Sequence, residues 1–175
     1  MKKLFLISAL IFVSITLNAQ VSVDPDTKLI TYQEVVTMEG TKDVLYSRAI
    51  AWINSYFKNP QGVTTKRDPE NGEILCAYRF WMKDADKDGN LVNSTTMVEF
   101  KFRIELKEGR YRYTFNQFRK KAASMFHLER WLDKSDPQYT PKCDGYLLQV
   151  DENIKEIIAS LKKGMEPKAV KKDDW

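Results

Sequence analysis

The segment MVEFKFRIELKEGRYRYTFNQF, residues 97–118, alternates apolar and polar side chains in two consecutive stretches. The apolar positions are Val98, Phe100, Phe102, Ile104 and Leu106 in the first stretch and Tyr111, Tyr113 and Phe115 in the second. Since successive side chains of a β-strand point to opposite faces, the pattern predicts two strands that each have one buried face and one charged, solvated face. The Glu108-Gly109 pair between them predicts a tight hairpin turn. The apolar face of this hairpin requires a cover, which the rest of the chain must supply.

Two amphipathic helices are predicted to form that cover. Apolar residues recur at three- and four-residue spacing after Thr41, a typical N-cap residue, and predict a helix over residues 42–58 that ends before Pro60. A second stripe of the same kind predicts a helix over residues 151–163, with Asp151 as its cap.

Further strands are predicted on both sides of the first helix. Residues 29–36 form one strand, residues 62–67 and 73–81 form two more, and residues 83–90 connect these to the central hairpin. Because βαβ alternation is missing, the order strand, helix, four strands, helix predicts an α+β fold with a single curved antiparallel sheet and helices packed on one face. Residues 119–144 form a long excursion before the last helix.

The first nineteen residues have the organisation of a secretory signal peptide. Lys2 and Lys3 precede an apolar run over residues 4–17, and Ala19 is a suitable last residue before cleavage. This run is too short for a membrane anchor, and no later segment is apolar enough to span a bilayer. We therefore expect a signal peptide at residues 1–19, cleavage near Ala19 and a periplasmic or secreted protein; the alternative is a buried N-terminal helix.

The mature chain is predicted to contain one domain. Residues 20–27 are expected to be a loose lead, residues 28–165 the α+β domain including the excursion, and residues 166–175 a charged tail. Removal of the signal peptide, which contains two lysines, lowers the formal net charge from +4 to +2. This nearly balanced charge, together with export, argues against a nucleic-acid partner.

Several segments carry a resemblance to a known family. They are KDVLYSRA at residues 42–49, the hairpin around Gly72, YRYTF at residues 111–115 and NIKEIIASLKKGM at residues 153–165. Together they resemble a family of exported Gram-negative bacterial proteins of unknown function, described as having a TATA-binding-protein-like fold. The resemblance covers residues 30–165 and implies this fold. It supplies no catalytic residue, and the name of the fold does not imply DNA binding.

The sequence predicts no catalytic chemistry. The only histidine, His127, lies in the excursion, and nothing indicates that Cys76 or Cys143 lies beside it, so neither a nucleophile–base pair nor a zinc site is predicted and no cofactor is expected. Glu99 and Glu105 alternate with cations along one strand, which predicts a cross-strand charge ladder. The two cysteines are expected to be free thiols, with Cys76 in the core; the alternative is one disulfide between Cys76 and Cys143, which an oxidising compartment would permit. A hydrolase-type enzyme that uses His127 is the alternative.

One connection resembles half of a calcium-binding loop. Its oxygen ligands would be Asp84, Asp86, Asp88 and Asn90. The twelfth position of the loop is Thr95, where a bidentate glutamate is expected, and the flanking segments are predicted strands rather than helices. Asp, Asn and Gly are also the residues that any strand connection prefers, so weak calcium binding is an alternative to an ordinary turn.

Four aromatic residues are predicted to bind a ligand or partner. Phe126, Trp131 and Tyr139 lie on the excursion, and Trp81 ends a strand on the side opposite its core-facing residues. The competing interpretation is that Phe126 and Trp131 close the open end of the core. The function predicted from these features is a non-catalytic exported binding or accessory module of the cell envelope that recognises a protein partner or a small apolar ligand.

Overall fold

The computed structural model of the protein describes residues 21–122 and 126–167. The predicted signal peptide and residues 168–175 of the predicted tail lie outside these described residues. None of the helices within the described ranges is long and apolar enough to cross a membrane.

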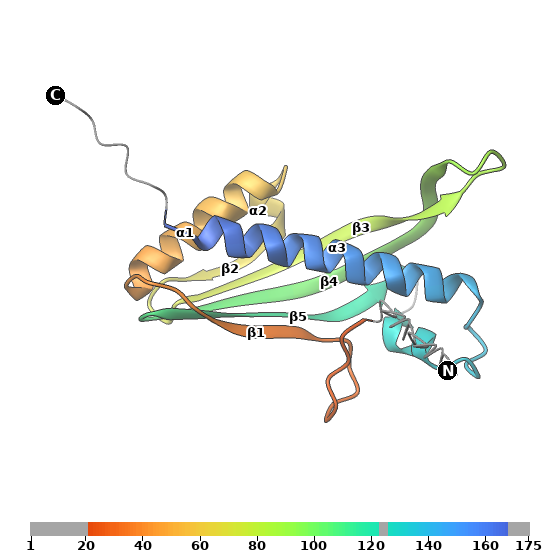
Figure 1. The fold of residues 1–175 in the computed structure, drawn as a ribbon, viewed down its shortest axis with the longest axis horizontal. Helices are drawn as coiled ribbons and strands as arrows, with labels where there is room; N and C mark the ends of the chain where they lie inside the picture. Colours follow the sequence, from red (N-terminus) through yellow and green to blue (C-terminus); the bar gives the residue numbers. More distant parts are fainter. Residues whose placement is uncertain (1–20, 123–125, 168–175) are drawn as a thin grey trace, which may run out of the picture.

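The described chain forms one six-stranded antiparallel sheet with the strand order β1-β5-β4-β3-β2 and with β6 paired to β5 (Figure 1). The strands are β1 Tyr32–Thr37, β2 Thr64–Asp68, β3 Glu73–Ala85, β4 Leu91–Lys107, β5 Arg110–Lys120 and β6 Phe126–His127. The predicted hairpin is therefore present as β4 and β5, with Gly109 at a φ of 69° in the turn, where a residue without Cβ avoids strain. The predicted fold class, a single antiparallel sheet with helices on one face, is confirmed.

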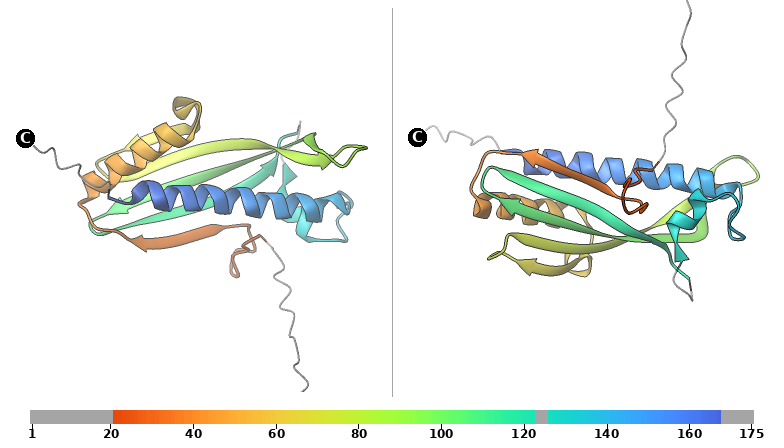
Figure 2. Two further views of the ribbon diagram at one scale, coloured as in Figure 1. Left: turned by 45° about the horizontal axis from the view of Figure 1, so that its top comes forward. Right: turned by 90° about the horizontal axis from the view of Figure 1, so that it is seen from below.

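Two long helices cover one face of this sheet. The helical segments are α1 Lys42–Tyr56, α2 Pro60–Val63, the 3-10 helix η1 Leu128–Leu132 and α3 Lys142–Met165. Helices α1 and α3 contact each other and lie on the same side of the sheet in both views of Figure 2. Thr41 caps α1 as predicted, since its side chain accepts a hydrogen bond from the Val44 N–H.

Helix α3 begins at Lys142, nine residues before the predicted start, and continues to Met165. The prediction of Asp151 as the cap was wrong, because this carboxylate is buried in the middle of the helix. It accepts hydrogen bonds from the Tyr32 hydroxyl at 3.0 Å and from the Lys155 ammonium at 2.6 Å. Its partner Tyr32 lies 119 residues away in the chain. The sequence around Asp151 therefore could not show whether this carboxylate caps a helix or forms a buried hydrogen bond inside one.

The strands also differ from their predicted bounds. Residues 83–90 do not form one connection, because β3 continues to Ala85 and β4 starts at Leu91. Residues 62–67 do not form one strand, because the Asn59 side chain accepts a hydrogen bond from the Gly62 N–H and so caps the short helix α2 before β2 begins.

Residues 21–27 pack onto the domain instead of forming a loose lead. Val21 is buried, and Val23 pairs with Ile30 in an isolated β-bridge. The Asp24 carboxylate closes the turn between them by accepting hydrogen bonds from the backbone N–H groups of Asp26 and Thr27.

Aromatic side chains fill the space between the sheet and α1. Phe102 of β4 stacks on Phe115 of β5 with ring centroids 5.0 Å apart and on Phe57 at 5.9 Å. Trp52 of α1 meets Phe102 edge-on at 6.2 Å. These contacts hold the strands against the helices and leave the opposite side of the sheet as a rigid platform.

Candidate functional site

The face of the sheet opposite α1 and α3 (Figure 2), here called the open face, carries the alternate polar side chains of all five long strands. The strand register sets these residues side by side: Lys107 lies opposite Arg110, and Glu105 lies opposite Arg112 and Glu73. Since directly paired residues point to the same face, the register determines which charges become neighbours.

Positive charge is concentrated on the open face. Its eight cationic and four acidic side chains are Lys66, Arg79, Lys101, Arg103, Lys107, Arg110, Arg112 and Arg119, and Asp68, Glu73, Glu99 and Glu105. This face therefore carries four more positive than negative side chains, whereas residues 20–175 as a whole have a formal net charge of +2, so the other residues of that segment sum to −2. A chain with little net charge thus has one strongly basic face.

The carboxylates of the open face all form ion pairs. Arg112 holds Glu105 with two hydrogen bonds, at 2.7 Å from Nε to Oε2 and 2.6 Å from Nη2 to Oε1. Arg119 pairs with Glu99 at 3.0 Å. The predicted cross-strand ladder of Glu99 and Glu105 is therefore confirmed, with both partners on β5. The remaining carboxylates, Glu73 and Asp68, pair with Arg103 and Lys66.

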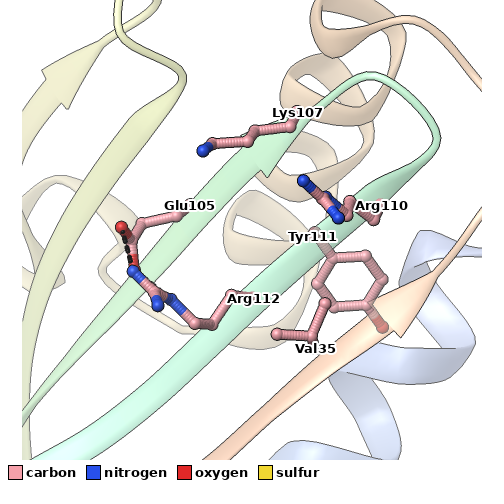
Figure 3. Close-up of a pocket in the computed structure, with 6 residues that line it drawn as sticks. All are labelled: Val35, Glu105, Lys107, Arg110, Tyr111 and Arg112. Atoms are coloured by element: carbon pink, nitrogen blue, oxygen red, sulfur yellow. Dashed lines mark hydrogen bonds and ion pairs between the residues drawn. The ribbon is translucent and has the colours of Figure 1, made fainter.

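Four cations of the open face are left without a carboxylate. Arg79, Lys101, Lys107 and Arg110 are exposed and form no ion pair with any of the residues described by the structure. Figure 3 shows two of them: Lys107 and Arg110 lie between the linked Glu105–Arg112 pair and the β4–β5 turn. Sequence reasoning missed these residues as a group, although their alternation with buried apolar residues placed each of them on the solvated face.

Three hollows follow the open face. The first, about 200 Å³, lies beside the β4–β5 turn, with Val35 and Tyr111 next to the charged residues of Figure 3. The second, about 360 Å³, shares Glu105 and Arg112 with the first. The third, about 460 Å³, shares Lys101 with the second. Because neighbouring hollows share lining residues, they lie next to one another along the open face, and together they are here called the trough.

The Glu105–Arg112 pair makes a testable contribution to stability against acid. The hydrogen bonds from Arg112 lower the pKa of Glu105 below its ordinary value, and the charges of Arg112, Arg103 and Lys107 act in the same direction. A folded-state pKa below the unfolded value of about 4.3 means that this stabilisation is present above that pH and is lost as the pH falls through the folded-state pKa.

We therefore expect Glu105→Gln to lower the free energy of unfolding at pH 7 by up to about 1 kcal/mol, since the pair is largely exposed. The difference in the free energy of unfolding between this variant and the parent protein should shrink as the pH is lowered from 6 to 3. Urea titrations at several pH values measure it, with Glu108→Gln in the turn as the control. A deficit that does not depend on pH would contradict the assignment.

The four aromatic residues predicted to bind a ligand or partner occupy different environments. Trp81 is 47% exposed and lies on the open face opposite Met97. Phe126 and Trp131 are buried together, with ring centroids 6.0 Å apart, and Tyr139 packs on the core and donates a hydrogen bond to Asp144. The structure thus brings Phe126 and Trp131 together inside the core, and only Trp81 lies on the open face.

The candidate calcium ligands are used within the fold. The Asp84 carboxylate accepts a hydrogen bond from Tyr146 at 2.9 Å and pairs with Lys142 at 3.3 Å. Asp86 accepts hydrogen bonds from the backbone N–H groups of Asp88 and Asn90, as in an ordinary turn. Within residues 21–122 and 126–167, no three His, Cys, Asp or Glu side chains cluster in a way that could hold a metal ion.

His127 lies at the end of the open face, whereas the two cysteines are shielded from solvent. His127 is exposed on the short strand β6, directly opposite Arg119, which lines the third hollow. Cys76 and Cys143 are buried free thiols, as predicted. Burial raises the pKa of the Cys76 thiol to about 12, so this group is a poor nucleophile at neutral pH.

A single antiparallel sheet with both long helices on one face defines a TBP-like α+β domain, and two solved structures share this fold. A DUF4468 family protein from Bacteroides ovatus superposes with a TM-score of 0.65 at 12% sequence identity and covers 89% of this chain and 95% of its own. A TBP-like protein from Parabacteroides distasonis gives a TM-score of 0.62 at 13% identity, covering 78% and 92%. No curated protein is significantly similar to the chain.

The sequence model of the family described as "Domain of unknown function (DUF4468) with TBP-like fold" matches residues 32–121, just over half of the chain. The chain belongs to this family. The resemblance inferred from the sequence is thereby confirmed as to family and fold.

Proposed function

We propose that this protein is an exported, non-catalytic binding module of the cell envelope that receives a protein partner on its open face, after cleavage of a signal peptide near Ala19. One observation carries the proposal: the face of the sheet that neither α1 nor α3 covers carries four more positive than negative side chains. A charged face on a rigid sheet is suited to recognition through electrostatic complementarity.

The chemistry of the open face favours a protein over the other ligand classes. Nine of the twelve residues that line the hollow of about 360 Å³ are charged or polar, which does not suit a small apolar ligand. Trp81 is the one half-exposed aromatic side chain available for base stacking among the described open-face residues, so this face offers little stacking surface to a nucleic acid. The hydrolase alternative would need a nucleophile near His127, and the buried Cys76 thiol is unsuited to that role.

Site-specific photocrosslinking in the native host tests this function. A photoreactive amino acid at Ala77 or Thr114, both on the open face, should give the same adduct in the envelope fraction, whereas one at the exposed Glu152 of α3 should not. An excess of the purified unmodified protein should abolish the adduct, and His127→Ala should leave its yield unchanged. Adducts that form equally from all three positions, or only from Glu152, would place the partner elsewhere.

A further inference from the structure

The four cations that lack a carboxylate form two pairs at opposite ends of the trough. Lys107 and Arg110 are direct cross-strand neighbours beside the β4–β5 turn. At the other end, Lys101 lies opposite Ala77, and Arg79 is two residues further along β3. This diagonal arrangement places Arg79 and Lys101 about 7–8 Å apart at their backbones, within reach of one ligand group for such long side chains.

The distance between the two pairs follows from strand geometry. Lys101 and Lys107 lie on the same strand, six residues apart. At about 3.3–3.4 Å per residue, this separation is about 20 Å. The charged groups between them are already matched, because Glu105 pairs with Arg112 and Glu73 pairs with Arg103. The open face therefore presents a doubly positive end, a neutral middle and a second doubly positive end.

The middle of the trough offers groups that suit a polypeptide backbone. Gln33, Thr114 and Asn116 line the hollow of about 360 Å³ that joins the two ends. Their hydroxyl and amide groups both donate and accept hydrogen bonds. An extended chain needs such partners for its own N–H and C=O groups.

We propose that the partner's contact segment is an extended acidic peptide that lies along β4 and places one pair of carboxylates at Lys107 and Arg110 and another, about 20 Å away, at Arg79 and Lys101. This inference rests on the proposed function and adds the chemistry and spacing of the partner. Six residues of an extended strand span the same about 20 Å, and alternate residues share a face, so a segment of nine residues places two carboxylates at each cation pair.

Two capped nonapeptides of equal composition test the spacing. One carries glutamate at positions 1, 3, 7 and 9, all on one face of the extended chain, with threonine at the other five positions; the other carries four adjacent glutamates at positions 3–6 with threonine elsewhere. At low ionic strength, the first peptide should bind the protein at least about threefold more tightly, since two exposed ion pairs at each end contribute several tenths of a kcal/mol each. Moderate salt should weaken this binding.

Paired variants locate the contacts. Lys107→Ala combined with Arg110→Ala, or Arg79→Ala combined with Lys101→Ala, should each remove the preference for the spaced peptide. Lys58→Ala combined with Lys87→Ala removes the same charge from exposed positions off the open face and should preserve the preference. If the parent protein bound the two peptides with equal affinity, or if the control variant lost the preference as fully as the two paired variants, the proposed spacing would be wrong.

An eight-nucleotide oligothymidylate serves as the competing polyanion. If it bound more tightly than the spaced peptide and lost affinity in the same two paired variants, the assignment to an acidic polypeptide would be wrong. Failure of this inference is distinguishable from failure of the proposed function. Open-face crosslinks together with equal peptide affinities would refute only the spacing.

Discussion

Phe102→Ala is expected to lower the free energy of unfolding by about 3–5 kcal/mol, the cost of removing a large buried aromatic side chain and leaving a cavity. Phe102 is 2% exposed and stacks on both Phe115 and Phe57. It joins the middle of the sheet to the end of α1, so the surrounding side chains cannot collapse into the space without moving the helix. Urea denaturation followed by circular dichroism measures the change.

Lys101→Ala is the matched control for this prediction, because Lys101 is the neighbour of Phe102 on the same strand and points to the open face. Its substitution should change the free energy of unfolding by less than about 0.5 kcal/mol. Similar losses for the two variants would contradict the assignment of the two faces of β4, on which the proposed binding surface also depends.

Gly164→Ala should destabilise the protein by about 1–3 kcal/mol, although alanine is the better helix former. A Cβ atom at this position of α3 would lie 2.7–2.9 Å from three carbon atoms of Trp52. The Trp52 side chain is buried, and its indole N–H donates a hydrogen bond to Ser160. It therefore cannot move away without breaking other contacts between α1 and α3. Thermal and urea unfolding both measure the effect.

Gly145→Ala, in the same helix, is expected to have the opposite effect on stability. Nothing lies within 4 Å of a Cβ atom built at Gly145. The substitution should therefore stabilise the protein by about 0.5–1 kcal/mol through helix propensity alone. If the two substitutions changed stability in the same direction, the close approach of α1 and α3 at Gly164 would be refuted.

The structure explains how a chain with little net charge can carry a strongly basic face. Buried aromatic residues hold α1 against β4 and β5 on one side of the sheet, and this packing fixes the strands whose other sides form the open face. The core and the proposed binding surface therefore use alternate residues of the same strands. Substitutions such as Lys107→Ala should affect binding with little effect on folding, because the side chain is exposed and forms no ion pair with a described residue.

The sequence by itself determined the features that depend on local patterns. Alternation along residues 97–118 predicted the β4–β5 hairpin, its buried residues and its charged face, because a period of two is fixed by strand geometry. Thr41 and the helical spacing after it predicted α1, since capping and amphipathicity are properties of a short segment. Together with the family resemblance, these patterns were sufficient for the fold class.

Only the tertiary structure decided which distant residues meet. The strand order β1-β5-β4-β3-β2 brings Arg79 beside Lys101 and Lys107 beside Arg110, and pairs Glu105 with Arg112, so that matched and unmatched charges separate along the trough. Alternation assigns a residue to a face but does not select the neighbouring strand or its register, which result from packing across the whole domain. For the same reason, the sequence could not show that Asp151 binds Tyr32 inside the domain or that Phe126 and Trp131 belong to the core.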